Sequence, residues 1–189
     1  MPTALQLDTP RLTLRPWQPS DRAPFALMNA DPDVMTFFAA PLSRAESDDA
    51  IDRYLAQLDR DGFTMFAVEL RHDHSFAGTI GLQTMRTAIP NLSQPAVEIG
   101  WRLTRSAQGQ GLATEGARAL CTLAFRDFHL PQLVAITTPA NTASRRVMQK
   151  LGMTHRPELT FDHPSVPLGH TYRQHVLYSL DNPTPKDLS

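Results

Sequence analysis

The sequence predicts a single α+β domain built on a mixed, mostly antiparallel sheet of six to seven strands with about four helices. Three strand-like stretches follow one another over residues 63–70, 76–82 and 96–103, which is typical of an antiparallel meander. A long helical stretch at 111–129 then separates the last of them from another short strand at 133–137. This strand–helix–strand order predicts a parallel pair with a right-handed crossover.

The residues before the meander predict one strand and two helices. Residues 5–15 alternate apolar and polar side chains, with an interruption near Pro10, as in a broken strand. Residues 20–30 begin with two capping residues and continue helically. Ser43 and Glu46 form a capping-box pattern, which predicts a second helix start. The apolar residues behind this start repeat at helical spacing: Ile51, Tyr54, Leu55 and Leu58.

The chain after 137 predicts one more helix and one more strand. Residues 141–151 are helical in pattern and stop at Gly152, a typical glycine just beyond a helix end. The proline-rich stretch 155–167 predicts a loop, and 176–180 predicts the last strand. We therefore expect one domain over residues 1–181, followed by a frayed polar tail at 182–189.

Composition excludes several broad classes of function. The 189 residues carry 18 basic and 19 acidic side chains, so no excess charge favours nucleic acid or an anionic membrane as a partner. The sequence predicts no membrane helix and no signal peptide, because no apolar run approaches about 18 residues and the start lacks the basic-then-apolar order. Cys121 is the one cysteine, which excludes an intramolecular disulfide and fits a reducing, cytoplasmic location.

A glycine-rich turn lies between the strand 96–103 and the helix 111–129: Gln108-Gly109-Gln110-Gly111-Leu112-Ala113-Thr114-Glu115. Glycines allow close approach of a ligand, and a helix N-terminus attracts phosphate. The turn lacks the lysine of a nucleotide-hydrolase loop, and Thr114 stands where a dinucleotide fingerprint has its third glycine. From these residues alone, a strand-to-helix turn without a ligand is the alternative.

The pattern Gln108-x-x-Gly111-x-Ala113 resembles the pyrophosphate-binding signature of the GNAT superfamily of N-acetyltransferases. Stretches at 9–15, 98–103, 109–115 and 141–152 together resemble the RimJ/RimL-like branch, the protein N-terminal acetyltransferases. The resemblance implies a three-layer fold in which the parallel pair is splayed. It also implies an enzyme that transfers the acetyl group of acetyl-CoA to a primary amine by direct attack in a ternary complex.

The resemblance assigns most of the acetyl-CoA site to backbone groups. The pyrophosphate would bind the N–H groups of the turn, with the Thr114 hydroxyl added: Gln108, Gly109, Gln110, Gly111, Leu112 and Ala113. The pantetheine arm would pair with the strand at Trp101, Arg102 and Leu103, which carries a bulge in the family. One backbone N–H of this strand would hold the thioester oxygen.

The second helix supplies the remaining cofactor contacts that the resemblance implies. Asn141 would contact the pantetheine, Ser144 would lie near the sulfur, and Arg145 would reach a phosphate. The alternative for Asn141 and Ser144 is an ordinary N-cap followed by a helical serine. The alternative for Arg145 and Arg146 is a solvated basic face.

Two residues are the candidates for proton transfer. Glu98 lies in an apolar strand, so burial would raise its pKa into the range of a base for the incoming amine. The alternative is a glutamate that faces solvent or pairs with Arg102. Met148 stands where many GNAT enzymes have a tyrosine that protonates the CoA thiolate, so Ser144 or a water would take that part.

The acceptor side is expected among aromatic and histidine residues. Phe37 and Phe38 would wall the cleft, with core packing as the alternative, and His163 would line it, with a turn position before a proline as the alternative. His72 and His74 lack a third ligand, so no metal is expected.

The acceptor itself stays open between a protein N-terminus and a small molecule such as a polyamine, an amino sugar or an antibiotic. An acidic cleft would favour a polyamine, and a groove open at both ends would favour a peptide. A non-catalytic acyl-CoA-binding module is the rival outside enzymes. The protein is expected to act as a monomer or a homodimer, with no nucleic acid or membrane as partner.

Overall fold

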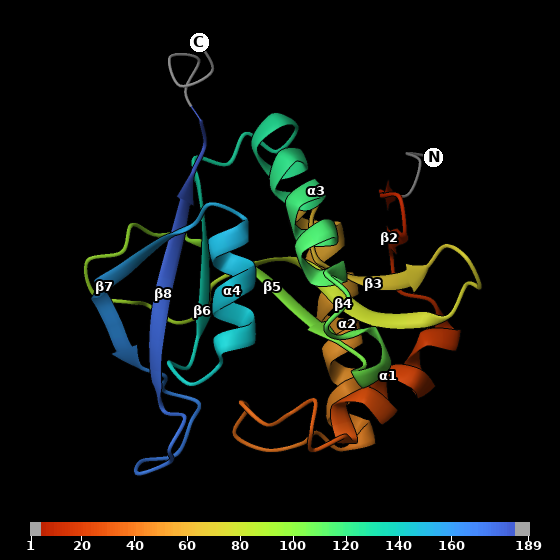
Figure 1. Ribbon diagram of the computed structural model, residues 1–189, viewed down its shortest axis with the longest axis horizontal. Coiled ribbons are helices and arrows are strands. Elements are labelled where there is room, and N and C mark those ends of the chain that lie inside the picture. The colour runs from red at the N-terminus through yellow and green to blue at the C-terminus, as the bar shows by residue number, and fades with distance from the viewer. Residues whose placement is uncertain (1–4, 184–189) are drawn as a thin grey trace.

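The computed structural model describes residues 5–183, whose strands form one eight-stranded sheet in the order β1-β2-β3-β4-β5-β6-β8-β7 (Figure 1). Neighbouring strands are antiparallel except β5 and β6, which are parallel. The α+β class, the meander and the crossover are therefore confirmed, with more strands than the six to seven predicted. The strands are β1 (Leu7–Asp8), β2 (Leu12–Arg15), β3 (Met65–Leu70), β4 (Phe76–Thr84), β5 (Val97–Leu103), β6 (Gln132–Thr137), β7 (Thr154–Asp162) and β8 (Gln174–Asp181).

Helices cover both faces of the sheet, which gives three layers. Helices α3 and α4 lie in front of the sheet in Figure 1, and α2 lies behind it. The larger core cluster joins α3 to the sheet, and a second cluster around Trp17 and Phe25 joins α1 and α2 to the other face. The helical segments are the 3-10 turn η1 (Pro19–Asp21), α1 (Arg22–Ala30), α2 (Arg44–Asp61), the 3-10 turn η2 (Arg105–Ala107), α3 (Leu112–Arg126) and α4 (Thr142–Lys150).

The predicted capping box of α2 and the predicted glycine after α4 are both confirmed. The Ser43 hydroxyl accepts a hydrogen bond from the Glu46 N–H, and the Glu46 carboxylate accepts one from the Ser43 N–H at 2.7 Å. Gly152 follows the end of α4 in a left-handed conformation with φ of 81°. Gly116 of α3 lies so close to the sheet that a Cβ atom there would come within 2.6 Å of Ile80.

Two predicted segments differ in the structure. The interruption near Pro10 is confirmed, but residues 5–15 form two separate strands, because the chain reverses at Thr9–Arg11 and β1 pairs antiparallel with β2. The stretch 155–167 is not only a loop, since β7 spans much of it. Pro157 is accommodated there because β7 is an edge strand whose register with β8 shifts between Arg156 and Phe161.

The sheet divides at the parallel pair into two parts, which we call the N-terminal arm (β1–β5) and the C-terminal arm (β6–β8). Strands β5 and β6 share one registered pair, Glu98 with Val134, and then part. By contrast, β4 and β5 stay in register from Thr84 and Val97 to Gly78 and Leu103. The bulge expected near Trp101 does not interrupt this register, so that expectation was wrong for the pairing with β4.

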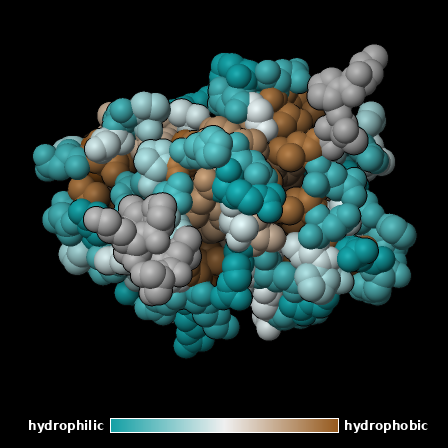
Figure 2. Space-filling view, turned by 90° about the horizontal axis from the view of Figure 1, so that it is seen from above, coloured by the Kyte–Doolittle hydropathy of each residue, from teal (hydrophilic) through white to brown (hydrophobic). Residues whose placement is uncertain are grey.

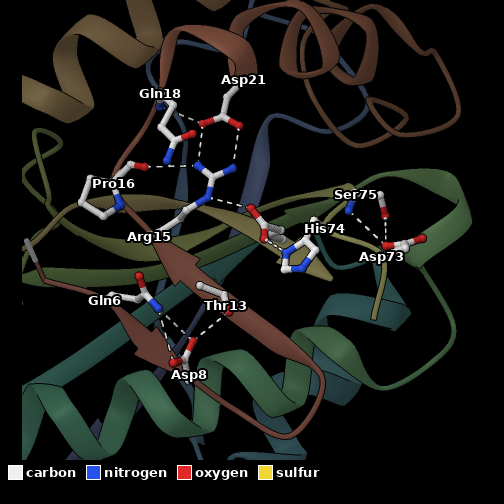
Figure 3. Close-up of polar contacts among 11 residues, drawn as sticks. Gln6, Asp8, Thr13, Arg15, Pro16, Gln18, Asp21, Asp73, His74 and Ser75 are labelled. Carbon is white, nitrogen blue, oxygen red and sulfur yellow. Dashed lines mark hydrogen bonds and ion pairs between the residues drawn. The ribbon is translucent and has the colours of Figure 1, made fainter. Parts of the chain in front are cut away.

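A partly buried polar network fixes the start of the N-terminal arm (Figure 3). Arg15 donates two hydrogen bonds to Asp21, at 2.8 and 3.0 Å, and a third to Glu69 at 2.9 Å. Glu69 also contacts His74 at 2.6 Å. The network joins β2 to η1 and to β3, so that α1 begins at a fixed place below the sheet.

The surface is mostly hydrophilic, with hydrophobic residues in patches between polar ones when the molecule is seen from above (Figure 2). None of the helices in residues 5–183 has both the length and the apolar character needed to cross a membrane. Of the predicted tail 182–189, residues 184–189 lie outside the described residues. Asn182 donates from its backbone to Pro131 at 2.9 Å and from its side chain to Leu130 at 3.1 Å.

Candidate active site

The glycine turn presents unpaired backbone donors at the start of α3. Gly109 and Gly111 adopt left-handed conformations, with φ of 74° and 79°, which bend the chain into the helix. The first backbone hydrogen bond of the helix runs from Glu115 N–H to the Gly111 carbonyl at 3.1 Å. The N–H groups of Leu112, Ala113 and Thr114 precede it and point out of the helix start. This end of the helix therefore favours an anionic ligand.

The side chains of the turn stabilise its shape by binding the chain's own carbonyls. Gln108 donates to the Leu103 carbonyl at 3.0 Å, and Gln110 donates to the Ser106 carbonyl at 2.7 Å. Arg11, in the reversal between β1 and β2, donates to the Gln110 carbonyl at 3.1 Å. None of these bonds uses an N–H group at the helix start.

Glu115 connects this turn to the beginning of the chain. Its carboxylate accepts hydrogen bonds from Thr9 Oγ1 at 2.7 Å and from Arg11 N–H at 2.9 Å, and it forms an ion pair with the Arg11 guanidinium at 2.6 Å. Burial raises the pKa of Glu115, but the bonds from Thr9 and Arg11 outweigh burial and hold it below its ordinary value. The stretches 9–15 and 109–115 are therefore in contact.

The edge of β5 that faces β6 has free backbone groups. Thr104 donates to Ala77 in β4, and Ala96 accepts from Met85 at the end of β4, so the even-numbered residues of β5 point their backbone groups toward β4. Trp101 and Leu103 consequently point theirs toward the gap between the arms, where the Leu103 carbonyl is already bound to the Gln108 amide. Because β5 and β6 share only the pair at Glu98, an extended ligand can hydrogen-bond to this edge.

The start of α4 faces the same gap from the C-terminal arm. Asn141 is the N-cap, and its side-chain oxygen accepts from Ser144 N–H at 3.1 Å. The Ser144 hydroxyl accepts from the Trp101 indole N–H at 3.1 Å, which joins the two arms. Arg145 turns the other way, donating to the Tyr178 hydroxyl and the Pro139 carbonyl, each at 3.2 Å.

Glu98 faces the α1 and α2 side of the sheet. It lies opposite Gln83 in β4, and the Gln83 amide donates to its carboxylate at 3.4 Å. Burial raises the pKa of Glu98 to about 7, although the Gln83 bond acts in the opposite direction. No ion pair forms between Glu98 and a cation in residues 5–183, so the alternative of a pair with Arg102 is not seen.

The Arg102 side chain also faces α1 and α2, away from the gap that its backbone neighbours line. Its guanidinium donates to Asn29 of α1, and the ring of Phe38 lies 4.3 Å from its central carbon. Tyr54 of α2 lies close enough to interact with the charges of both Arg102 and Glu98. Asn29 and Tyr54 were missed in the sequence. The two-residue alternation of β5, which places 98, 100 and 102 on one face, was the signal that could have found this side.

The structure places the three acceptor candidates at the loops that flank this face. Phe38 is 41% exposed above Arg102, and Phe37 contacts Tyr172 of the β7–β8 loop edge-on, with ring centres 5.3 Å apart. The His163 Nδ1 atom accepts from Ser165 N–H at 3.2 Å, the geometry of a turn residue. Burial, followed by the charges of His175 and Arg173, lowers the pKa of His163.

Three other side chains have structural positions. Met148 is 1% exposed in the core, and Trp17 packs between α1 and α2 with its indole donating to the Met65 carbonyl at 2.7 Å. Cys121 is buried in the core, and burial raises the pKa of its thiol to about 12. The described part of the chain holds no group of three or more His, Cys, Asp or Glu side chains placed to bind a metal ion.

Comparisons with known proteins show the family and the fold of the chain. A family model described as an acetyltransferase (GNAT) domain matches residues 11–154. The chain is 24% identical over 176 residues, 93% of its length and 96% of the relative's, to "Uncharacterized N-acetyltransferase YnaD" of Bacillus subtilis. A solved acetyltransferase of Agrobacterium tumefaciens is 26% identical and superposes with a TM-score of 0.75, covering 94% of this chain and 95% of that one. The ribosomal L7/L12 acetyltransferase RimL, solved with coenzyme A, shares the fold with a TM-score of 0.75 at 20% identity over 94% of this chain and 98% of its own.

Proposed function

The chain belongs to the GNAT family of acetyltransferases, and from this premise we propose that it transfers the acetyl group of acetyl-CoA to a primary amine. One observation carries the proposal. The helix start with its unpaired N–H groups, at Gly111, lies at the end of the same strand whose free edge faces the gap between the arms. A ligand that carries both a pyrophosphate and an extended chain would match the helix start and the free strand edge.

In this proposal, acetyl-CoA binds through backbone groups. The pyrophosphate binds the N–H groups from Gln108 to Ala113, and Thr114 contributes its hydroxyl. The pantetheine pairs with β5 at Trp101 and Leu103, where it acts as an added strand. Asn141 and Ser144 lie beside the sulfur end. Arg145 is left out, because its guanidinium is bound to Tyr178 and Pro139.

The chemistry is a direct transfer. The uncharged amine attacks the thioester carbon, a carbon–nitrogen bond forms, and the carbon–sulfur bond breaks. A backbone N–H of β5 stabilises the developing oxyanion. Glu98, directly or through a water, takes the proton of the amine, and its pKa of about 7 suits that task at neutral pH. The CoA thiolate leaves and is then protonated by the Ser144 hydroxyl or a water. Because a thiol has an ordinary pKa of about 8.5, the thiolate is an adequate leaving group near neutral pH.

Calorimetric titration with acetyl-CoA tests the binding site. Gly111→Glu places a carboxylate at the proposed pyrophosphate position, and we expect at least a tenfold loss of affinity. Gly62→Glu is the matched control, since Gly62 also has a left-handed conformation and open space for a side chain. Micromolar binding to the wild type and the control, lost in Gly111→Glu, supports the proposal. Absence of binding to the wild type would refute it.

A further inference from the structure

Arg102 is a partly buried cation whose side chain the proposed transfer does not use. Its guanidinium faces α1 and α2, and its Nε atom is buried without a hydrogen-bond partner. Within residues 5–183, no carboxylate pairs with it. Burial lowers the pKa of Arg102, and the nearby Tyr54 acts in the opposite direction. A buried charge normally has an ionic partner, because desolvation without one is costly.

The groups around Arg102 orient the guanidinium without neutralising it. Asn29 accepts one of its N–H groups, and Asn29 is itself fixed by donating to the Ser47 hydroxyl at 3.0 Å. The ring of Phe38 covers one face of the guanidinium. The guanidinium is therefore held in place and stays available to an anionic group.

This anion site adjoins the proposed base. Glu98, Gly100 and Arg102 lie in line on one face of β5, and four residues of strand separate the backbone positions of Glu98 and Arg102 by roughly 13 Å. Gly100 adds no side chain between them, and a Cβ atom there would contact only Met65, at 3.6 Å. An acceptor bound to Arg102 would therefore lie along the face that carries Glu98.

The surrounding loops limit the length of the acceptor. Phe38 covers Arg102, and its neighbour Phe37 contacts Tyr172 of the other arm. The loops 31–43 and 163–173 lie at the same end of the molecule in Figure 1, and this aromatic contact joins them. A groove open at both ends, as a long peptide requires, is interrupted there. A cation beside the base also disfavours a polyamine, which carries further positive charges.

We propose, building on acetyl transfer as the function, that Arg102 binds a carboxylate of the acceptor. The acceptor is then a small amine that bears a carboxylate, as an amino acid does. The carboxylate forms a charge-assisted pair with the guanidinium, and the amine lies toward Glu98 and the thioester. This assignment makes Arg102 a specificity-determining residue on the acceptor side, whereas its backbone belongs to the cofactor strand.

The test compares acceptors that differ only in this charge. Amino acids of increasing amine-to-carboxylate spacing, from glycine to 5-aminopentanoate, are assayed against their amides by release of the CoA thiol. For the amino acids whose spacing suits the site, the wild type should show a kcat/KM at least tenfold higher than for the corresponding amides. In Arg102→Gln that preference should vanish through KM, with the amide rates changed less than threefold, and Arg102→Lys should restore part of it. If Arg102 had only a structural role, Arg102→Gln would lower kcat/KM for acids and amides alike. Arg86→Gln, which changes an exposed arginine elsewhere, is the control.

Several outcomes would overturn the assignment: amides as good as acids, a preference that survives in Arg102→Gln, or acceptance only of longer peptides. Failure of acetyl transfer itself is a separate result, seen as no thiol release with any acceptor and no binding of acetyl-CoA. Calorimetry with N-acetylated amino acids and their amides gives a readout without turnover. Binding of the acid alone, lost in Arg102→Gln, supports the carboxylate site, and equal binding of the amide refutes it.

Discussion

Replacing Glu98 with glutamine removes a carboxyl that the fold makes difficult to ionise. Burial raises its pKa from 4.5 to about 7. The folded state therefore binds a proton that the unfolded chain has already released above pH 4.5. Stability from this group is present below that pH and is lost as the pH rises to about 7. Glutamine has the same shape and no such dependence, so the variant should gain stability relative to the wild type as the pH rises.

The size of this gain follows from the two pKa values. Each pH unit between them is worth about 1.4 kcal/mol, so the full span of 2.5 units corresponds to roughly 3 kcal/mol. Between about pH 5.5 and pH 8, the free energy of unfolding of Glu98→Gln minus that of the wild type should rise by about 2 kcal/mol.

Urea unfolding of both proteins across this range measures the difference. The same measurement on Asp59→Asn, an exposed carboxylate of α2, provides the baseline. A difference between Glu98→Gln and the wild type that stays constant with pH would refute a raised pKa for Glu98. The proposed base would lose its physical basis with it. If the pKa is confirmed, kcat/KM of the wild type should fall about tenfold per pH unit below 7, and Glu98→Gln should lose this limb.

Three further predictions concern the fold. Gly116→Ala should lower the free energy of unfolding by about 1–3 kcal/mol in denaturant titrations, because its Cβ would lie 2.6 Å from Ile80, and an unchanged midpoint would show that the contact relaxes freely. Ser43→Ala should cost about 1 kcal/mol through loss of the hydrogen bond to Glu46 N–H, whereas a neutral result would assign the helix start to packing alone. The Cys121 thiol should stay unmodified by a thiol reagent in the native protein at about pH 8, with a pKa of about 12, and rapid labelling would contradict its burial.

Most of the sheet could be predicted because its strands show period-two alternation and end at clear turn residues. Strand β7 could not, since Pro157 lies within it and a proline normally argues against a strand. Only the tertiary context shows that β7 is an edge with a shifted register. The pair of strands β1 and β2 was missed for a similar reason, because hydrophobic alternation does not reveal whether the chain continues or reverses at Pro10.

The candidate site was predicted unevenly. The glycine turn and the start of α4 could be located because turns and helix starts have local sequence patterns, whereas their roles in binding rest on the family resemblance and stay predictions. Phe38 was predicted on the acceptor side, but its contact with Arg102 and the bond from Arg102 to Asn29 were not, since these residues come from separate elements that only the fold brings together. The face of the strand on which Arg102 lies follows from its distance of four residues from Glu98. What meets that face depends on α1 and α2, which the spacing does not place.

The parting of β5 and β6 after Glu98 makes the sheet two plates with a seam between them. Along the seam, the peptide groups of Trp101 and Leu103 have no neighbouring strand to shield their amide hydrogens. We expect those hydrogens to exchange with solvent as hydrogens at a sheet edge do, although they lie in the middle of an eight-stranded sheet. An extended ligand bound in the seam would act as the neighbouring strand and link the plates. Binding of such a ligand should therefore slow hydrogen exchange at these two amides.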